Sequence, residues 1–227
     1  MVVDHGKKVT TQDSRVPDLF GANLPSRQEI PIHSPAKCRS EAPGWYGPRQ
    51  QIPDDKIPFS VEFIDYSARF IISSIHAERM HHSGAHPEDI RLVPRESIYS
   101  FLPLKFDKEG YPLTPLGRTG LCGLGELYNY GASFTADTLI RRWNPSGGHW
   151  EMLAILRDDC HQRAIIGGFH DKGETLIETA CREVKEEVQL EIDPSRLRII
   201  YQGPVDDRRT TDNAWIETTL FDYKVSF

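Results

Sequence analysis

The sequence lacks two features that would each place it in a class of proteins. It has no apolar run long enough to cross a membrane, since a spanning helix needs about 20 consecutive apolar residues. It also has no excess of basic residues: 27 Lys and Arg stand against 33 Asp and Glu, a formal net charge of -6. The electrostatic field that attracts nucleic acid is therefore missing. We expect a globular protein that binds neither membranes nor nucleic acid.

Cysteine is also scarce, and no C-x-x-C pair is present. The four cysteines, Cys38, Cys122, Cys160 and Cys181, lie far apart. This spacing indicates reduced thiols in an intracellular protein and excludes a disulfide framework or a zinc site. The first thirty residues mix acidic with basic side chains and have no apolar core, so they fit neither a secretory signal nor a mitochondrial presequence. We expect a cytoplasmic protein, with the mitochondrion as the alternative compartment.

The pattern along the 227 residues predicts three parts. Residues 1–50 are polar and punctuated by proline, which favours irregular structure over much of their length. Residues 51–115 contain short apolar segments and are interpreted as a small N-terminal domain, α/β or mostly β. Residues 116–227 combine strand and helix patterns and form the second domain. Whether the protein is a monomer or an oligomer stays open.

Several short segments have the pattern of strands. "IPFSVEFID" (57–65) alternates apolar and polar residues, the period of a half-buried strand. "ADTLIRRW" (136–143) fits either a short helix or a strand, and "GGFHDKG" (167–173) is predicted to be a loop. Further strand candidates are, in chain order, residues 150–157, 163–166, 197–203 and 214–223.

A helix is predicted from about Glu174 to Val188. Asp171 and Glu174 have the spacing of a capping box at its start, and Asp193–Pro194 is expected to stop it. An apolar stripe at helical spacing would dock this helix on a sheet. The stripe consists of Ile177, Ala180, Cys181, Val184 and Val188.

The same helix carries a group of carboxylates in "REVKEE". Glu183, Glu186 and Glu187 fall within a sector of about 100°, away from the centre of the stripe. Like charges at these spacings destabilise a helix by roughly 0.2–0.5 kcal/mol per pair. Their hard oxygens suit Mg²⁺ or Mn²⁺, and Arg182 beside them can hold a carboxylate by hydrogen bonding. An isolated "ExxEE" is more often a solvated acidic face.

The spacing around this helix separates it from an ordinary acidic face. Gly168, Glu174 and "REVKEE" together fit the pattern G-x5-E-x7-R-E-U-x-E-E, in which U is apolar. At this point the sequence resembles the Nudix box of the Nudix hydrolase family. It departs from that pattern at Gln189, where the family usually has Gly, and at Ile166, where related sequences often have Pro. Neither position supplies a metal-binding side chain.

Three other stretches resemble the ADP-ribose pyrophosphatase branch of this family, which is related to the ADP-ribose-binding domain of a melastatin-type cation channel. They are "IPDDKIPFSVEFIDY" (52–66), "GRTGLCGLGELYNYGASFTAD" (117–137) and "GPVDDRRTTDNAWIET" (203–218). The resemblance implies an α/β fold, a Nudix α/β/α sandwich with a smaller N-terminal domain. Because the sequence stops at Phe227, inside or just after a strand, we expect the C-terminal part of that fold to be missing.

The resemblance also implies a reaction and its residues. The reaction is Mg²⁺-dependent hydrolysis of the pyrophosphate of ADP-ribose to AMP and ribose 5-phosphate, with Mn²⁺ as the alternative ion. The implied catalytic residues are Glu174, Arg182, Glu183, Glu186 and Glu187, of which Glu183, Glu186 and Glu187 hold the metal. The implied substrate-binding residues are Gly167, Gly168, Asp206, Asp207, Arg208, Asp212, Asn213 and Trp215.

The residue types in "VDDRRTTDNAW" fit this role in a simple way. The aspartates could accept hydrogen bonds from ribose hydroxyls, Arg208 or Arg209 could pair with phosphate, and Trp215 could stack on a base. The alternative is an Asx-rich turn before a strand, with the tryptophan in the core.

Two alternative functions remain: a sensor that binds ADP-ribose with little or no catalysis, and a fragment without function. The intact "REVKEE" favours the enzyme over the sensor. Two other motifs are rejected. The Gly-rich stretch has Tyr128 where a dinucleotide fingerprint needs its third glycine. His76, His81, His82 and His86 lack the ordered spacing of a metal site and are predicted to lie on a mobile surface loop.

Overall fold

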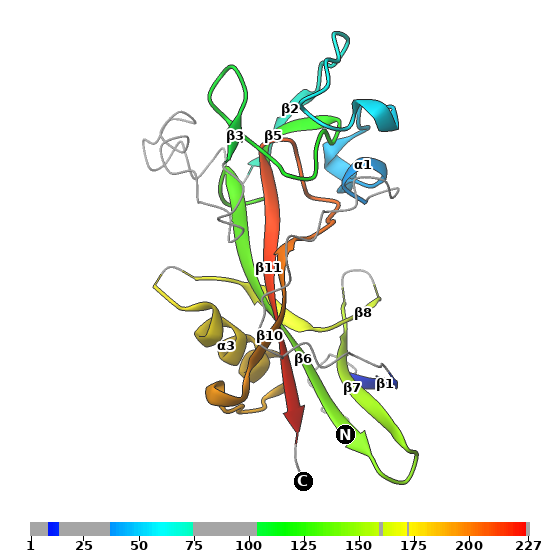
Figure 1. Cartoon of the computed structure of the whole chain (residues 1–227), viewed down its shortest axis with the longest axis vertical. Helices are drawn as coiled ribbons and strands as arrows, with labels where there is room; N and C mark the ends of the chain where they lie inside the picture. The colour runs from blue at the N-terminus through cyan, green and yellow to red at the C-terminus, as the bar shows by residue number, and fades with distance from the viewer. Residues whose placement is uncertain (1–8, 14–36, 75–103, 159–160, 172, 226–227) are drawn as a thin grey trace. The chain divides into compact units, whose positions relative to one another are not determined.

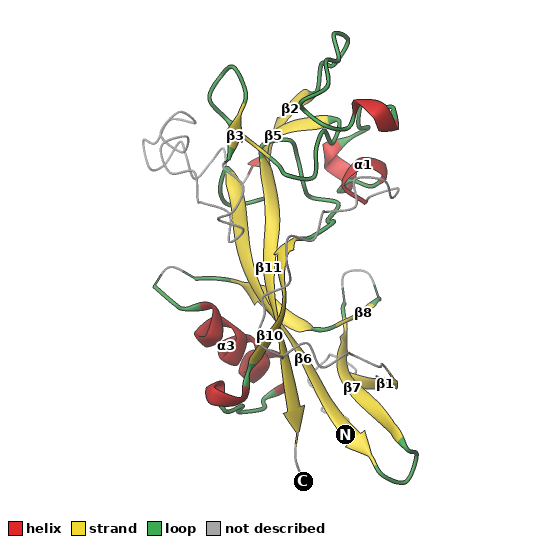
Figure 2. Cartoon of the chain, in the orientation of Figure 1, coloured by secondary structure: helices red, strands yellow, loops and turns green. Residues whose placement is uncertain are grey.

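The computed structural model describes residues 9–13, 37–74, 104–158, 161–171 and 173–225 (Figures 1 and 2). Strands predominate in these ranges, and their longest helix is α3, Leu176–Val188. No helix in the described ranges is long and apolar enough to span a membrane. The predicted His-rich loop lies outside the described residues.

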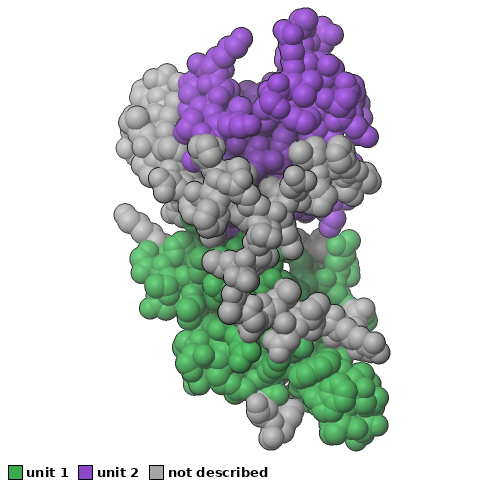
Figure 3. Space-filling view, viewed as in Figure 1, with its two compact units in different colours: residues 1–26, 134–202, 218–227 green, residues 27–133, 203–217 purple. Residues whose placement is uncertain are grey.

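The chain divides into two compact units, shown in two colours in Figure 3. Unit 1 comprises residues 1–26, 134–202 and 218–227, and unit 2 comprises residues 27–133 and 203–217. Each unit is therefore built from segments that are distant in sequence. The three-part division predicted from the sequence, with boundaries after residues 50 and 115, stays a prediction.

The larger sheet has the strand order β1-β7-β6-β11-β10, with β8 beside β7 and β9 beside β6. Its strands are β1 (Val9–Asp13), β6 (Gly131–Asn144), β7 (His149–Leu156), β8 (Arg163–Ala164), β9 (Ile166–Phe169), β10 (Arg198–Pro204) and β11 (Ala214–Val225). The pair β6–β7 is an antiparallel hairpin, and β9 pairs with β6 so that Gly167 lies opposite Asp137. "ADTLIRRW" is thus part of a strand, and the strands predicted at 150–157, 197–203 and 214–223 are confirmed.

The predicted loop "GGFHDKG" is wrong in its first half, because β9 continues through Phe169. "RAII" is likewise divided between β8 and β9. Strands are predicted from the alternation of apolar and polar side chains, and glycine has no side chain to contribute. The pattern therefore stops before Gly167, although the backbone of β9 goes on pairing with β6.

The apolar side of α3 packs on the sheet within unit 1. The buried members of this core are Ile140, Ile155, Ile166, Val184, Val188, Ile192 and Tyr223, with Cys181 packed against them. A second cluster joins Ala180 of α3 to Ala136 and Phe221. Ile177, predicted to belong to the stripe, is 42% exposed, and Leu176 packs against the second cluster instead. The stripe is otherwise confirmed.

Unit 2 is built from short elements. They are α1 (Lys37–Ser40), η1 (Gly44–Tyr46), η2 (Asp54–Lys56), β2 (Arg69–Ile72), β3 (Lys105–Phe106), β4 (Pro112–Leu113) and β5 (Leu121–Gly125). The strands β2 and β5 pair in parallel, and β3 pairs with β4 antiparallel. Tyr46, Ile71 and Leu121 form a small buried cluster between these elements.

The strand predicted from "IPFSVEFID" is absent, and this segment forms turns around Arg118. The guanidinium of Arg118 donates three hydrogen bonds to backbone carbonyls between Lys56 and Val61. It also lies 5.4 and 5.8 Å from the ring centroids of Phe59 and Phe63. Carbonyls that accept hydrogen bonds from Arg118 are not available to pair with a neighbouring strand, and the rings pack on the guanidinium instead of on a sheet. The segment therefore has the alternation of a strand without forming one.

Candidate active site

The acidic helix α3 begins at a capping box, but not at the predicted one. Thr175 is the N-cap: its hydroxyl accepts from the N–H of Glu178 at 3.2 Å, and the Glu178 carboxylate accepts from the N–H of Thr175 at 2.7 Å. The box predicted at Asp171 and Glu174 is wrong, because both residues precede the helix. This placement leaves the Glu174 carboxylate to interact with Arg182.

The helix ends at Val188, as predicted. Gln189 adopts a left-handed conformation, with φ 54° and ψ 30°, and its N–H bonds to the Lys185 carbonyl at 3.0 Å. Glycine adopts this conformation without strain, so the departure of this sequence at Gln189 has a conformational cost. Asp193, predicted to stop the helix, instead caps a short 3-10 helix, η4 (Pro194–Arg196).

Arg182 is the centre of the acidic face of α3. Its Nε and Nη2 bind the two carboxylate oxygens of Glu174, at 2.8 and 3.1 Å. Its Nη1 donates to Glu183 at 2.7 Å and to Glu186 at 3.2 Å, and its Nη2 also donates to the Phe169 carbonyl at 3.0 Å. These bonds raise the pKa of Arg182 and lower the pKa of Glu174 to about 2. One guanidinium thus offsets the repulsion among three carboxylates.

Glu183 lies over the strand that precedes the helix. A Cβ at Gly168 would collide with the Glu183 carboxylate, so another residue there would require this carboxylate to move. The side chain of Glu183 is 14% exposed, whereas that of Glu186 is 60% exposed. Burial raises the pKa of Glu183 despite its bond to Arg182. The glycine that begins the Nudix spacing is therefore a position of close approach.

Glu187 and Asp137 meet at Gly167. The N–H of Gly167 donates to Glu187 Oε2 at 3.4 Å, and a Cβ at Gly167 would collide with Asp137 Oδ1. Asp137 accepts hydrogen bonds from Thr218 and Thr135. Burial raises the pKa of Asp137, and the neighbouring charge of Glu187 adds to the increase. A fourth carboxylate therefore joins the three that the motif identified.

The donor chemistry of this face fits a divalent cation. In the described part of the chain, no group of three or more His, Cys, Asp or Glu side chains is arranged so that it could hold a metal ion. Glu183, Glu186 and Glu187 nevertheless supply hard oxygens from adjacent turns of one helix. A carboxylate bonded to Arg182 keeps further lone pairs, and the exposed Glu186 has room to change its rotamer.

Three of the predicted substrate-binding residues, Asp206, Asp207 and Arg208, lie next to each other in unit 2. Asp206 accepts hydrogen bonds from the first two backbone N–H groups of α1, at 2.8 and 2.9 Å. Asp207 binds the guanidinium of Arg209 through both oxygens, at 2.8 and 2.9 Å. Arg208 is exposed, and its carbonyl accepts from Arg49 at 2.7 Å.

Asp212 and Asn213 are buried in the same unit. The Asp212 carboxylate accepts from the hydroxyl of Tyr66 at 2.6 Å and from the N–H and hydroxyl of Thr119 at 2.7 and 2.9 Å. Burial raises the pKa of Asp212 to about 6. Asn213 accepts from the N–H of Gly123 at 2.8 Å. The described contacts of these two side chains thus link segments of unit 2 to one another.

Trp215 is fully buried, and its indole N–H donates to Glu217 at 2.8 Å. In this arrangement the ring fills the core, the second of the two roles expected for it. The structure therefore brings Gly167 and Gly168 together with the acidic helix inside unit 1. The substrate contacts expected from the residues of unit 2 stay predictions.

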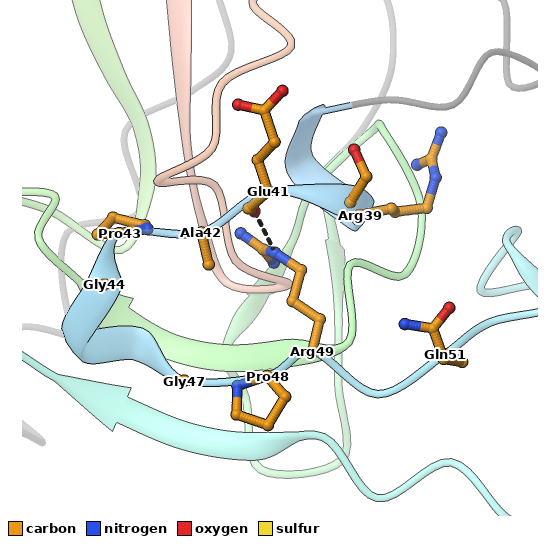
Figure 4. A pocket seen from close by; sticks show the side chains of 10 residues that line it. Arg39, Glu41, Ala42, Pro43, Gly44, Gly47, Pro48, Arg49 and Gln51 are labelled. Atoms are coloured by element: carbon orange, nitrogen blue, oxygen red, sulfur yellow. Dashed lines mark hydrogen bonds between the residues drawn. The ribbon is translucent and has the colours of Figure 1, made fainter. Parts of the chain in front are cut away.

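A separate hollow of about 340 Å³ lies in unit 2 (Figure 4). It is lined by Arg39, Ser40, Glu41, Ala42, Pro43, Gly44, Gly47, Pro48, Arg49 and Gln51. Arg49 donates to the Glu41 carbonyl at 2.7 Å, the dashed line in Figure 4, and also to the carbonyls of Thr119, Arg208 and Thr210. This guanidinium binds backbone carbonyls at every described contact. None of the residues of α3 lines the hollow. We place the candidate site on α3 because Arg182 and the carboxylates gather there.

Sequence reasoning did not identify three side chains at this site: Asp137, His170 and Thr179. Asp137 lies on β6 and reaches Gly167 only through strand pairing, for which no local pattern exists. Thr179 could have been found by helical periodicity, since it lies three and four residues before Arg182 and Glu183. His170 follows β9 directly, in a stretch that the sequence predicts to be a loop.

Comparison with known proteins finds two families along the chain. Residues 134–226 match the NUDIX domain, and residues 52–131 match the family described as NUDT9-like, N-terminal domain. The mitochondrial ADP-ribose pyrophosphatase of Rattus norvegicus is 31% identical over 237 residues, which cover 84% of this chain and 65% of that protein. The transient receptor potential cation channel subfamily M member 2 of Mus musculus is 28% identical over 188 residues, 75% of this chain and 12% of the channel.

Among solved structures, the NUDIX domain of Shewanella oneidensis NrtR complexed with ADP ribose is similar to this chain with a TM-score of 0.35 and 17% identity. The match covers 43% of this chain and 62% of that one. The chain thus spans less than two thirds of the length of each of these three proteins.

Proposed function

The chain contains a Nudix domain of mixed α/β fold, preceded by a NUDT9-like N-terminal domain, and we propose that it hydrolyses the pyrophosphate of ADP-ribose. The products are AMP and ribose 5-phosphate. The similarity to the rat ADP-ribose pyrophosphatase supports this choice of substrate. We propose Mg²⁺ as the cofactor, with Mn²⁺ as the alternative, and the cytoplasm as the compartment.

The observation that carries the proposal is the set of bonds that Arg182 makes on α3. A solvated acidic face needs no such arrangement, because water separates its charges. Here a single guanidinium fixes Glu174 and contacts Glu183 and Glu186, while Glu187 lies at the N–H of Gly167. Side chains held in this way present their oxygens in a limited set of directions, which is what recognition of a compact divalent cation requires.

The residues of the chain have distinct roles in this proposal. Glu183, Glu186 and Glu187 would hold the cation, which when bound supplies charge neutralisation at the pyrophosphate and an activated water. Arg182 orients two of these carboxylates, and Glu174 orients Arg182. Gly168 leaves room for the Glu183 carboxylate beside the strand.

The proposed substrate contacts divide into two groups by their accessibility. Gly167 and Gly168 lie at the acidic helix, and the exposed side chain of Arg208 is able to meet a phosphate. Asp206 and Asp207 have hydrogen-bond partners within unit 2. Contacts to the remaining three, Asp212, Asn213 and Trp215, would require these buried side chains to become accessible.

The test is to incubate the purified chain with ADP-ribose and Mg²⁺ and to measure AMP by ion-exchange chromatography. Dinucleotide and other nucleoside diphosphate substrates are assayed alongside it, and a reaction with EDTA serves as the control. We expect AMP and ribose 5-phosphate in equal amounts, with ADP-ribose as the preferred substrate. Calorimetric binding of ADP-ribose without AMP release would contradict hydrolysis and support the sensor. Cleavage of another substrate alone would reject ADP-ribose.

A further inference from the structure

A second set of hydrogen bonds reaches the Glu174 carboxylate from the strand side of unit 1. His170 Nδ1 lies 3.2 Å from Thr179 Oγ1, and Thr179 Oγ1 lies 2.9 Å from Glu174 Oε2. Thr179 is fully buried in α3. The backbone N–H of His170 donates to the Phe134 carbonyl at 3.0 Å, which anchors the histidine to β6. These contacts form the His170–Thr179–Glu174 chain.

The direction of the protons in this chain follows from counting hydrogens, because a threonine hydroxyl carries only one. Two neighbours of Thr179 Oγ1 can only accept a hydrogen bond. They are the Glu174 carboxylate, which is ionised because its pKa is lowered to about 2, and the Thr175 carbonyl at 3.1 Å. The hydroxyl hydrogen therefore points to Glu174, which is charged and is the nearer of the two at 2.9 Å, and the oxygen meets His170 with a lone pair.

A hydrogen bond to that lone pair requires a proton on Nδ1 of His170. If Nδ1 carried the lone pair, the Thr179 hydroxyl would have to turn toward the ring and away from Glu174. The carboxylate would then face the hydroxyl oxygen at 2.9 Å without a hydrogen between them, which is repulsive. The contacts thus select the Nδ1–H tautomer, and in the neutral ring the lone pair is on Nε2.

We propose that His170 is a positioning residue of the candidate active site. Its Nδ1–H group directs the Thr179 hydroxyl to Glu174, and Glu174 holds Arg182 against Glu183 and Glu186. This inference rests on the proposed function for the cation that these carboxylates would bind. Because His170 acts through three other side chains, its loss should weaken cation binding by about tenfold without removing any ligand.

The tautomer itself is measurable by long-range ¹H–¹⁵N correlation spectra of the imidazole rings. The signals of His170 are assigned by their loss in His170→Asn, and the neutral ring is observed at the alkaline end of a pH series. We expect a protonated Nδ1 in the wild-type chain and in Thr179→Ser. Thr179→Val removes the acceptor and should release this preference. A proton on Nε2 in the wild-type chain overturns the proposal.

Cation affinity provides the second measurement, by titration with Mn²⁺ monitored by electron paramagnetic resonance. His170→Ala and Thr179→Val should each weaken binding by about tenfold, and the double variant should be no weaker than Thr179→Val alone. Thr179→Ser and His170→Asn, which keep the hydroxyl and a donor in the place of Nδ1, should stay close to wild type. Independent, additive losses would overturn the chain of contacts. Circular dichroism checks that each variant is folded.

These results separate the positioning role from the proposed reaction, because neither measurement uses AMP release. An Nδ1–H tautomer with coupled losses of Mn²⁺ affinity, in a chain that releases no AMP, would contradict ADP-ribose hydrolysis and leave the positioning role standing. Release of AMP by a chain whose His170 carries its proton on Nε2 would overturn the positioning role alone.

Discussion

The acidic face of α3 and the stretch from Asp206 to Trp215 are similar in composition but use their charges differently. On α3, Arg182 is shared among three carboxylates, and Glu186 remains 60% exposed. In the later stretch, Asp207 has a bidentate arginine partner of its own, and Asp212 is buried among hydroxyl and N–H donors. Both regions were predicted to bind ligands.

The difference distinguishes a surface suited to a ligand from a structural framework. Carboxylates that outnumber their cationic partners still attract positive charge, whereas a buried carboxylate such as that of Asp212 has its hydrogen bonds directed to the segments around it. We therefore expect substitutions on the acidic face of α3 to change catalysis with little change in stability. Substitutions of the buried residues Asp212, Asn213 and Trp215 should do the reverse.

The largest effect on stability is expected for Trp215→Ala. Removing a fully buried indole should lower the free energy of unfolding by about 3–5 kcal/mol, measured by urea denaturation. Trp215→Phe, which keeps most of the ring volume, is the matched control and should lose less. If Trp215→Ala instead keeps its stability and raises the KM for ADP-ribose, the ring stacks on the substrate and the comparison fails.

A smaller effect should appear in the pH dependence of stability through Asp212. Its pKa is raised from 3.8 to about 6 in the folded chain, so the folded state holds this proton to higher pH than the unfolded state does. Stability should therefore fall as pH rises from about 4 to about 6, by on the order of 3 kcal/mol. Asp212→Asn should lack this component of the pH profile, whereas Glu186→Gln should retain it. A profile unchanged in Asp212→Asn would show that another group titrates.

The smallest effect is expected at the C-terminal end of α3. Gln189→Gly should raise the free energy of unfolding by about 1 kcal/mol, because glycine relieves the left-handed conformation at this position. Gln189→Ala keeps a Cβ and should give no such gain. The free energies of unfolding of the two variants are compared by thermal unfolding, and AMP release should be the same in both. Equal stability of the glycine and alanine variants would contradict the conformational explanation.

The sequence predicts those parts of the site that depend on residues close together in the chain. It does not predict contacts between residues that are far apart in the chain. The spacing from Gly168 to Glu187 identified the helix and its carboxylates, and the expectation that Arg182 holds a carboxylate agrees with its bonds. The capping box was misplaced because Asp171–Glu174 and Thr175–Glu178 share one spacing. Local spacing cannot separate two such candidates when both precede the same apolar stripe.

Features that depend on distant partners were missed or misassigned. Asp137 reaches the site only through the register of β6 with β9. The alternation of "IPFSVEFID" arises from residues that surround Arg118 and not from a sheet. The sequence does not distinguish a Trp215 that stacks on a base from one that fills the core, because an aromatic side chain suits both. Its burial depends on the packing of the whole unit.

The most direct test of the account is Mg²⁺-dependent AMP release by the variant Glu186→Gln/Glu187→Gln, measured beside its unfolding curve. Both substitutions keep the shape of the side chain and remove its charge. We predict that activity falls by about a thousandfold or more, while the free energy of unfolding stays within about 0.5 kcal/mol of wild type. Full activity in this variant would contradict the assignment of the acidic face of α3 as the catalytic site.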